Sequence, residues 1–309
     1  MIMTFVLADT PLLSRATLDR AEQLRGDVAA LHTGWPTAAV LRIAKGGRFR
    51  VDGSALVLDP ATDLAAEPPE EAVFLGVDRG RHVWAVFDKQ LDGSAATELG
   101  DLRMLGGRLD DTSAGMITTA VALLGWHNRA RFSSVDGTAT RPTGAGWSRM
   151  SASGHEEFPR TDPAVICLVH DGGDRVLLAR QQGWPATMFS ILAGFVEAGE
   201  SLETCVEREI REEVGLAVTD VRYLGSQPWP FPRSLMLGFA AHGNPDAALT
   251  FADGEIAEAH WFSRAEVRAA LQAGDWTNGG DGVETAAGVR LLLPGSISIA
   301  RGIVTAWAG

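Results

Sequence analysis

Several features are scarce or missing in this sequence of 309 residues. It has two cysteines, Cys167 and Cys205, which are too few for a four-thiolate zinc site and give no sign of a disulfide framework. It has no Lys/Arg run, and 39 acidic against 27 basic side chains give a formal net charge of −12. Capture of nucleic acid or of an anionic membrane by a broad basic surface is therefore not expected.

Long apolar segments are also missing. No stretch is long enough to span a bilayer, and the first residues lack a basic region followed by a signal-peptide core. With 46% hydrophobic residues the chain can nevertheless bury substantial cores, and its length suits about two domains. We therefore expect a soluble, cytoplasmic protein with no membrane partner.

Residues 1–126 have a mixed α/β pattern. Apolar runs separated by Gly, Asp and Pro predict strands at Ala39–Ile43, Ala55–Leu58, Ala72–Val77 and His82–Phe87. Thr112–Leu124 has helical character, with Asp111 as a possible N-cap and Gly125 as a stop. No residue pattern in this domain indicates chemistry beyond packing.

Residues 127–160 differ in composition from both flanks. They are rich in Gly, Thr, Ser and Arg, which predicts a short irregular connector. From residue 161 to 309 the sequence patterns of strands and helices are clear again. We expect these residues to form the C-terminal domain, which follows the N-terminal domain and the connector. The fold class is thus α/β (α+β), with an N-terminal mixed α/β domain, a connector and a C-terminal domain.

The C-terminal domain is expected to combine several strands with at least two helices. Its predicted strands are Ala164–His170, Arg175–Ala179, Ile191–Ala193, Val221–Ser226, Leu235–Ala241 and His260–Phe262. A helix is predicted over Ser201–Val214, ended by Gly215. Ser263 and Glu266 form a capping-box pattern that opens a second helix through about Gln272.

Three glutamates on the first of these helices indicate a cation site. Glu209, Glu212 and Glu213 are spaced i, i+3 and i+4, so their side chains share one helix face. Their mutual repulsion weakens an isolated helix, and binding of a cation relieves it. Because all the ligands are hard oxygens, the pattern favours Mg²⁺ or Mn²⁺ over zinc.

The remainder of this helix predicts how it is held. An apolar row at i, i+4 spacing can dock on a sheet, and it consists of Leu202, Val206, Ile210 and Val214. Glu200 and Arg208 have opposite charges and are expected to brace the preceding loop against the helix. Gly194 would allow that loop to approach a ligand closely.

The segment Gly194–Leu216, GFVEAGESLETCVEREIREEVGL, resembles the complete Nudix box without a departure. Resemblance to the Nudix hydrolases implies a C-terminal α/β/α sandwich and attack of water on a phosphorus of a nucleoside diphosphate. It also implies that Glu209, Glu213 and the backbone carbonyl of Ala193 bind the metal. Glu212 or Glu213 would bind or deprotonate the water, and the family does not fix which one is the general base.

A stiff aromatic segment, Ser226–Ser234, follows the box. Three alternate prolines fix Trp229 and Phe231, which suits a site for a flat ring. The segment is similar to the SQPWPFPxS signature of the NADH pyrophosphatase subgroup, whose members split NADH or NAD⁺ into nicotinamide mononucleotide and AMP, and some of which remove NAD caps from RNA 5′ ends. The resemblance implies that the substrate contacts Gln227, Pro228, Trp229, Pro230, Phe231, Pro232, Arg233 and Ser234.

The same resemblance extends over about residues 115–309 and assigns four further residues. Glu255 falls where the subgroup places another metal ligand, and Ala300 where it places a substrate contact. Phe195 matches an aromatic residue that stacks on the nucleotide. Phe158 takes the place of a Tyr that the family contributes across a homodimer interface, so a homodimer is expected.

The sequence departs from the family at a zinc ribbon. Where many relatives have four zinc-binding cysteines, this chain has Ser133, Asp136, Met150 and Ser153. Since one carboxylate does not make a zinc site, we expect no structural zinc. The catalytic glutamates are all present, so this departure leaves the predicted catalysis intact.

Three functions compete. The first is an NAD(H) diphosphatase, supported by the Nudix box and the proline-aromatic segment. The second is a Nudix hydrolase of another substrate, such as ADP-ribose, diadenosine polyphosphate or NAD-capped RNA. The third is a non-catalytic nucleotide sensor, which loss of a box glutamate would favour, and none is lost.

Overall fold

The computed structural model describes residues 5–93, 97–252, 254–277 and 279–309. The chain divides into two compact units. The C-terminal unit consists of Met1–Ser14, Asp162–Pro228 and Ser234–Gly309, and the N-terminal unit of Arg15–Thr161 and Trp229–Arg233. None of the helices in the described residues is long and apolar enough to cross a membrane.

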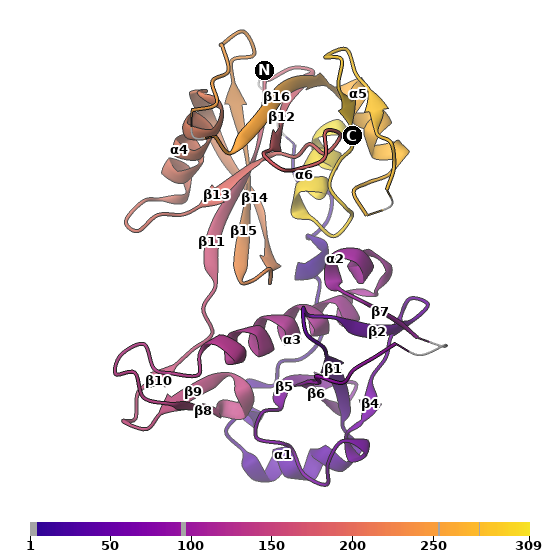
Figure 1. Cartoon of the computed structure of the whole chain (residues 1–309), viewed down its shortest axis with the longest axis vertical. Helices are drawn as coiled ribbons and strands as arrows, with labels where there is room; N and C mark the ends of the chain where they lie inside the picture. Colours follow the sequence, from indigo (N-terminus) through magenta and orange to yellow (C-terminus); the bar gives the residue numbers. More distant parts are fainter. Residues whose placement is uncertain (1–4, 94–96, 253, 278) are drawn as a thin grey trace. The chain divides into compact units, whose positions relative to one another are not determined.

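The N-terminal unit is built on a four-stranded sheet of order β4-β1-β6-β5 (Figure 1). Its strands are β1 (Ala39–Ile43), β2 (Phe49–Asp52), β3 (Ala55–Leu56), β4 (Asp59–Pro60), β5 (Val73–Asp78), β6 (Arg81–Phe87) and β7 (Glu98–Gly100). Its helices are α1 (Val28–Gly34), α2 (Leu102–Leu105) and α3 (Asp111–Arg129). The four predicted strands are confirmed, with ends that differ by one or two residues.

The two faces of this sheet are covered by different helices (Figure 1). Trp35, Phe74 and Trp84 pack edge to face on the side of α1. Helix α3 covers the opposite face with a stripe of buried residues that includes Ile117 and Leu124. The mixed α/β architecture predicted for this part of the chain is therefore present.

Helix α3 is longer than the sequence predicts. Its N-cap is Asp110, whose carboxylate accepts a hydrogen bond from the Ser113 N–H at 2.9 Å, and not Asp111. The helix also runs through Gly125 to Arg129. A glycine inside a helix costs about 1 kcal/mol. Burial of Leu124 and His127 on either side of it offsets that cost, so Gly125 does not stop the helix.

The connector is more regular than its composition predicts. It contains β8 (Thr140–Thr143), β9 (Ser148–Ser151) and β10 (Glu156–Glu157), which form an antiparallel sheet of order β10-β9-β8. Hydrogen bonds among small polar side chains close its loops: Asp136 accepts from Ser153 and from Thr138, and Ser151 bonds Ser153 at 2.9 Å. These bonds hold the pKa of Asp136 far below its usual range.

The C-terminal unit is built on one mixed sheet of order β14-β15-β11-β12-β16, with β13 also paired to β11. Its strands are β11 (Asp162–His170), β12 (Arg175–Gln181), β13 (Leu192–Phe195), β14 (Val218–Trp229), β15 (Ser234–Gly243), β16 (Ile256–Ser263), β17 (Val283–Glu284) and β18 (Arg290–Leu291). Its helices are α4 (Leu202–Val214), α5 (Arg264–Ala273) and α6 (Ile299–Ala308).

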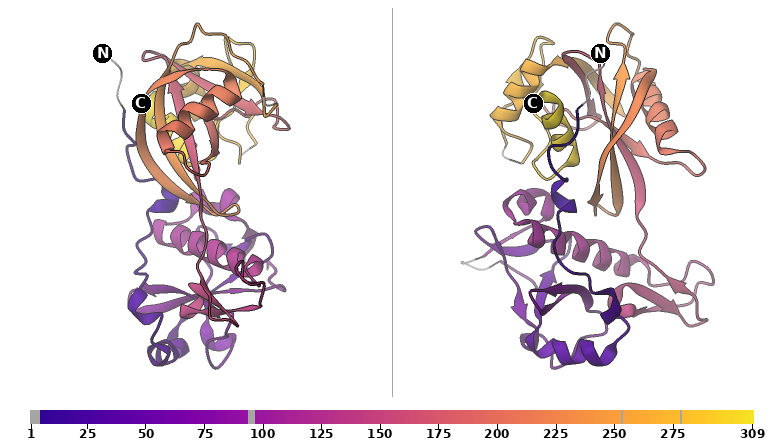
Figure 2. Two further views of the ribbon diagram at one scale, coloured as in Figure 1. Left: turned by 90° about the vertical axis from the view of Figure 1, so that its left-hand side faces the viewer. Right: turned by 180° about the vertical axis from the view of Figure 1, so that it is seen from behind.

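Helices cover both faces of this sheet, as Figure 2 shows. Alternate residues of β11 divide between two cores: Val165 and Cys167 pack beneath α4, whereas Ile166 and Leu168 pack beneath α5 and α6. This is the period-two alternation of a strand that is buried on both faces. The predicted α/β/α sandwich is confirmed.

The ends of α4 and α5 agree with the sequence signals. The Ser201 hydroxyl caps α4, and Gly215 ends it with a φ of 75°. The capping box of Ser263 and Glu266 is formed at α5. Helix α6 was not predicted, because its run of β-branched and glycine residues has weak helix propensity and only packing against the sheet selects it.

Candidate active site

A strand, a loop and a helix place the box residues together. Strand β13 leads through residues 196–201 into α4, and Gly194 of β13 lies directly against Glu209 of α4. A Cβ atom at position 194 would stand 1.9 Å from the carboxylate carbon of Glu209. Only glycine therefore lets the Glu209 carboxylate lie against this backbone, next to Ala193.

The three helix glutamates lie at different depths. The apolar row Val206, Ile210 and Val214 is buried against the sheet, as the sequence predicts. Glu213 is 2% exposed, and the side chain of Glu209 is 16% exposed. The side chain of Glu212 is 53% exposed. The acidic face therefore runs from the buried sheet side out to solvent.

Arg208 links the loop to the acidic face. Its guanidinium donates to Glu200 at 2.6 Å, to Glu209 at 2.9 Å and to Glu212 at 2.9 Å, and to the Phe195 carbonyl at 3.0 Å. These bonds lower the pKa of Glu200 to about 2 and raise that of Arg208. The predicted brace between Glu200 and Arg208 is confirmed.

Glu255 precedes β16 and belongs to the same electrostatic cluster. Its backbone carbonyl accepts a hydrogen bond from the Gln182 N–H at 2.7 Å, which fixes the chain at this point. Burial raises the pKa of Glu209, and the negative charges of Glu212 and Glu255 raise it further against the opposing effect of Arg208. Glu255 is therefore close enough to Glu209 for their charges to interact.

The donor set of this face fits a hard divalent cation. Glu209 and Glu213 are one helical turn apart, the carbonyl-bearing backbone of β13 lies beside Glu209, and Glu255 adds charge from the residue before β16. Among the described residues, no group of three or more His, Cys, Asp or Glu side chains is arranged so that it could hold a metal ion. The fit rests on the all-oxygen donors and on the repulsion that a cation would relieve.

The proline-aromatic segment contains residues with separate roles. Gln227 is fully buried, and its amide donates to the Ile297 carbonyl at 2.9 Å and accepts from the Leu13 N–H at 3.4 Å. Its side chain thus joins three segments of the C-terminal unit. Trp229 and Phe231 stack edge to face at 4.9 Å, and the Arg103 guanidinium lies 4.0 Å from the Phe231 ring.

The other residues assigned by resemblance have different exposures. Ser234 begins β15 and pairs with Asp162 of β11, and Ala300 is buried on α6. Phe195 is 57% exposed at the end of β13, so its ring is free to receive a planar group. Phe158 is 63% exposed in the N-terminal unit.

Sequence reasoning missed most of the contacts that Arg208 makes. The sequence indicates its pairing with Glu200, but the bonds to Glu209, Glu212 and the Phe195 carbonyl become visible only in the structure. The i, i+4 spacing of Arg208 and Glu212 indicates that one pair, whereas no local pattern indicates the bonds to Glu209 and to the Phe195 carbonyl.

Comparison with known proteins identifies both parts of the chain. Residues 160–279 match the NUDIX domain, and residues 36–126 match the NADH pyrophosphatase-like rudimentary NUDIX domain. Proteins named NAD-capped RNA hydrolase NudC from Mycobacterium bovis and Mycobacterium tuberculosis are 59% identical over 309 residues, covering 98% of this chain and 96% of theirs. The human protein named NAD(P)H pyrophosphatase NUDT13, mitochondrial, is 35% identical over 261 residues, covering 78% of this chain and 72% of its own. The chain therefore belongs to the Nudix hydrolases, in their NADH pyrophosphatase subgroup.

Proposed function

We propose that the protein is a metal-dependent NAD(H) diphosphatase. It hydrolyses the diphosphate of NADH or NAD⁺ to nicotinamide mononucleotide and AMP, and it also removes NAD caps from RNA 5′ ends. The observation that carries the proposal is the acidic face of α4 beside Gly194. The names of the relatives, NAD-capped RNA hydrolase and NAD(P)H pyrophosphatase, support the substrate.

Mg²⁺ or Mn²⁺ would be held by Glu209, Glu213, Glu255 and the carbonyl of Ala193. A cation there would neutralise charge on the diphosphate oxygens and make a bound water more acidic. Glu209 and Glu213 are suited to the role because they are fixed on one turn of α4 and partly or fully buried. Glu255 would contribute from the position that precedes β16.

The chain would supply the carboxylate that accepts the proton of the attacking water, and the contacts that hold this carboxylate in place. In the reaction a water oxygen bonds to one phosphorus, the bridging oxygen leaves with its electron pair, and a carboxylate takes the water proton. Glu212 and Glu213 are the two candidates for that carboxylate. Glu212 is exposed enough to exchange its proton with solvent, whereas Glu213 is buried and keeps a fixed position. Arg208 holds Glu209 and Glu212 in place from one side.

By resemblance, residues 227–234 and Ala300 would contact the substrate and Phe195 would stack on its nucleotide ring, but the structure buries the Gln227 side chain and Ala300. The exposed ring of Phe195 supports the stacking. Phe158, also exposed, would reach the site of the partner subunit in a homodimer. We propose that residues 1–126, 127–160 and 161–309 form the N-terminal domain, the connector and the Nudix domain, and that the catalytic glutamates act within the last of these. The connector would be closed by its hydrogen bonds without zinc, and the protein would act in the cytoplasm.

Product analysis by chromatography tests the proposal. The full chain with Mg²⁺ or Mn²⁺ is offered NADH, NAD⁺, ADP-ribose and NAD-capped RNA separately, beside a Glu213→Gln variant. Glu207→Gln is the matched control, since Glu207 lies on the same helix but is exposed to solvent. We expect AMP and reduced nicotinamide mononucleotide from NADH, lost in Glu213→Gln and retained in Glu207→Gln.

Two other results would change the assignment. Cleavage of ADP-ribose with NADH and NAD⁺ untouched would keep the hydrolase and refute the substrate. Tight binding of nucleotides with no turnover of any of them would make the protein a nucleotide sensor.

A further inference from the structure

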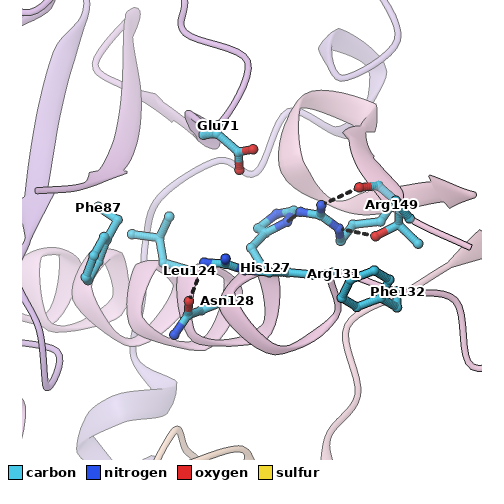
Figure 3. Close-up of a pocket in the computed structure, with 10 residues that line it drawn as sticks. Glu71, Phe87, Leu124, His127, Asn128, Arg131, Phe132 and Arg149 are labelled. Atoms are coloured by element: carbon cyan, nitrogen blue, oxygen red, sulfur yellow. Dashed lines mark hydrogen bonds between the residues drawn. The ribbon is translucent and has the colours of Figure 1, made fainter. Parts of the chain in front are cut away.

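The N-terminal unit contains a cavity of about 540 Å³ beside the last turns of α3 (Figure 3). Its wall combines side chains of α3, β8 and β9 with Phe132 and with Glu71, which precedes β5. Its size lies in the range of small-molecule sites, about 300–1,000 Å³. All of the lining residues belong to the N-terminal unit, so this cavity is separate from the glutamates of α4.

A buried arginine forms one side of the cavity. Arg149 is 5% exposed, and its guanidinium donates to the Thr140 hydroxyl at 2.7 Å, to the Thr140 carbonyl at 2.7 Å and to His127 at 2.9 Å. All three partners are neutral acceptors. None of the ion pairs within the described ranges of the chain includes Arg149, and Glu71 and Glu70 attract it only over a longer distance.

His127 is a neutral partner and does not compensate the positive charge of Arg149. Its Nε2 lies 2.8 Å from the Gly146 carbonyl, so Nε2–H is the donor and Nδ1 accepts from Arg149. Burial lowers the pKa of His127, which keeps the ring neutral and suited to accept. A buried cation without an ionic partner is costly. Three of the five N–H groups of Arg149 are engaged, which leaves one on each terminal nitrogen for an anion.

Further side chains extend the site beyond one charge. Arg131 is exposed on the cavity wall and folds back toward Asn128, to which it donates at 2.9 Å (Figure 3). Phe132 is 66% exposed on the side of Arg149. Glu71 faces the arginines from across the cavity. Among the described residues that line the cavity, it is the one with an acidic side chain.

We propose that this cavity binds a nucleotide, with its phosphate held by Arg131 and Arg149 and its base stacked on Phe132. Two guanidinium groups match the doubly charged, multiply accepting phosphate. An exposed aromatic ring beside them offers a stacking face to any base. Glu71 can accept hydrogen bonds from ribose hydroxyls across the cavity.

The ligand can be a free mononucleotide, whose phosphate is a doubly charged monoester, or one nucleotide unit of an RNA chain, whose phosphate is a singly charged diester. Both present phosphate oxygens to the arginines and a base to the aromatic ring. The proposal does not depend on hydrolysis at α4, since no residue of the cavity lies on that helix. It gives the N-terminal unit, in which the sequence shows no chemistry, a binding role of its own.

Equilibrium dialysis of AMP against the full chain tests the proposal, because it counts ligands per chain. The variants are Arg131→Gln and Phe132→Ala, both exposed, and their double variant. Arg141→Gln is the matched control, since Arg141 is an exposed arginine on β8 outside the cavity wall. We expect wild type and Arg141→Gln to bind one more AMP per chain than the double variant. Each single variant should weaken that site about tenfold.

Adenosine and an uncapped single-stranded oligonucleotide complete the test. Adenosine should bind this site at least about tenfold more weakly than AMP, because it lacks the phosphate. Tighter binding of the oligonucleotide, lost in the double variant, would identify RNA as the source of the nucleotide, whereas binding of AMP alone would identify a free nucleotide. Equal AMP stoichiometry in wild type and double variant would overturn the proposal. So would equal affinity for adenosine and AMP at this site. NADH turnover, measured on the same proteins, tests the hydrolase function proposed for α4. The number of AMP molecules bound per chain tests the cavity, so either proposal can fail without the other.

Discussion

Replacing Gly194 with alanine tests how the acidic face of α4 is assembled. The new Cβ would lie 1.9 Å from the carboxylate carbon of Glu209 and 2.1 and 2.2 Å from its two oxygens. To restore an ordinary contact of 3.4 Å, the carboxylate must retreat by about 1.5 Å. Gly194 has no left-handed backbone angle that would bar alanine, so the backbone can remain in place.

The consequence should be loss of activity without loss of fold. A misplacement of about 1 Å at a catalytic group can lower a rate on the order of 100-fold, so we expect kcat/KM for NADH to fall by about that factor. Because the obstructing atoms belong to the far end of a flexible side chain, the free energy of unfolding should change by less than about 1 kcal/mol. The affinity for Mn²⁺ should fall together with kcat/KM.

The assay combines release of AMP from NADH, Mn²⁺ titration and thermal melting of the same preparations. Gly125→Ala is the control, since an added Cβ there meets nothing within 4 Å. A Gly194→Ala protein that melts like wild type and keeps its rate within about threefold would refute the reasoning, because Glu209 would then not need its contact with this backbone.

Three further predictions follow from the described contacts. Arg208→Gln should lower kcat/KM at least about tenfold, because it frees the loop at Glu200 and the acidic face together; unchanged kinetics would show that the brace is dispensable. Burial alone would raise the pKa of Glu266, but hydrogen bonds from Ser263 and the Ala286 N–H outweigh it and lower the pKa. Glu266→Gln should therefore cost about 1 kcal/mol at neutral pH. The difference in stability between wild type and variant should be complete above the ordinary glutamate pKa of 4.5 and should vanish as the pH falls through the lower pKa of the folded protein. A difference in melting temperature that stays constant over this pH range would contradict the prediction. Gly125→Ala should raise the free energy of unfolding by about 0.5–1 kcal/mol, as measured by urea denaturation, and a loss of stability would indicate a contact at this position that the structure lacks.

The elements that could be predicted from sequence are those whose signals are local. The apolar runs of β11 and β12 and the caps of α4 and α5 depend on neighbouring residues only, and all are found where expected. The spacing of Glu209, Glu212 and Glu213 fixes their common helix face in the same way. The family resemblance then supplied the chemistry that spacing alone leaves open.

What could not be predicted depends on tertiary contacts. Gly125 reads as a helix stop until the packing of its neighbours is known, and α6 forms because it covers the sheet. Gln227 belongs to a signature of substrate-binding residues, yet its amide bonds to two distant segments, at positions 13 and 297. The cavity beside α3 combines residues from 71 to 149 that no local pattern connects.

Both cysteines lie inside the C-terminal unit, and this burial affects how the protein responds to oxidants. Burial raises the pKa of the Cys167 thiol, and it raises that of Cys205 to about 12, so neither sulfur forms a thiolate at physiological pH. The thiolate is the form that attacks peroxides and disulfides and is oxidised by them. Oxidants should therefore leave both thiols unmodified while the C-terminal unit is folded, and any change of activity in an oxidising medium should come from elsewhere in the protein.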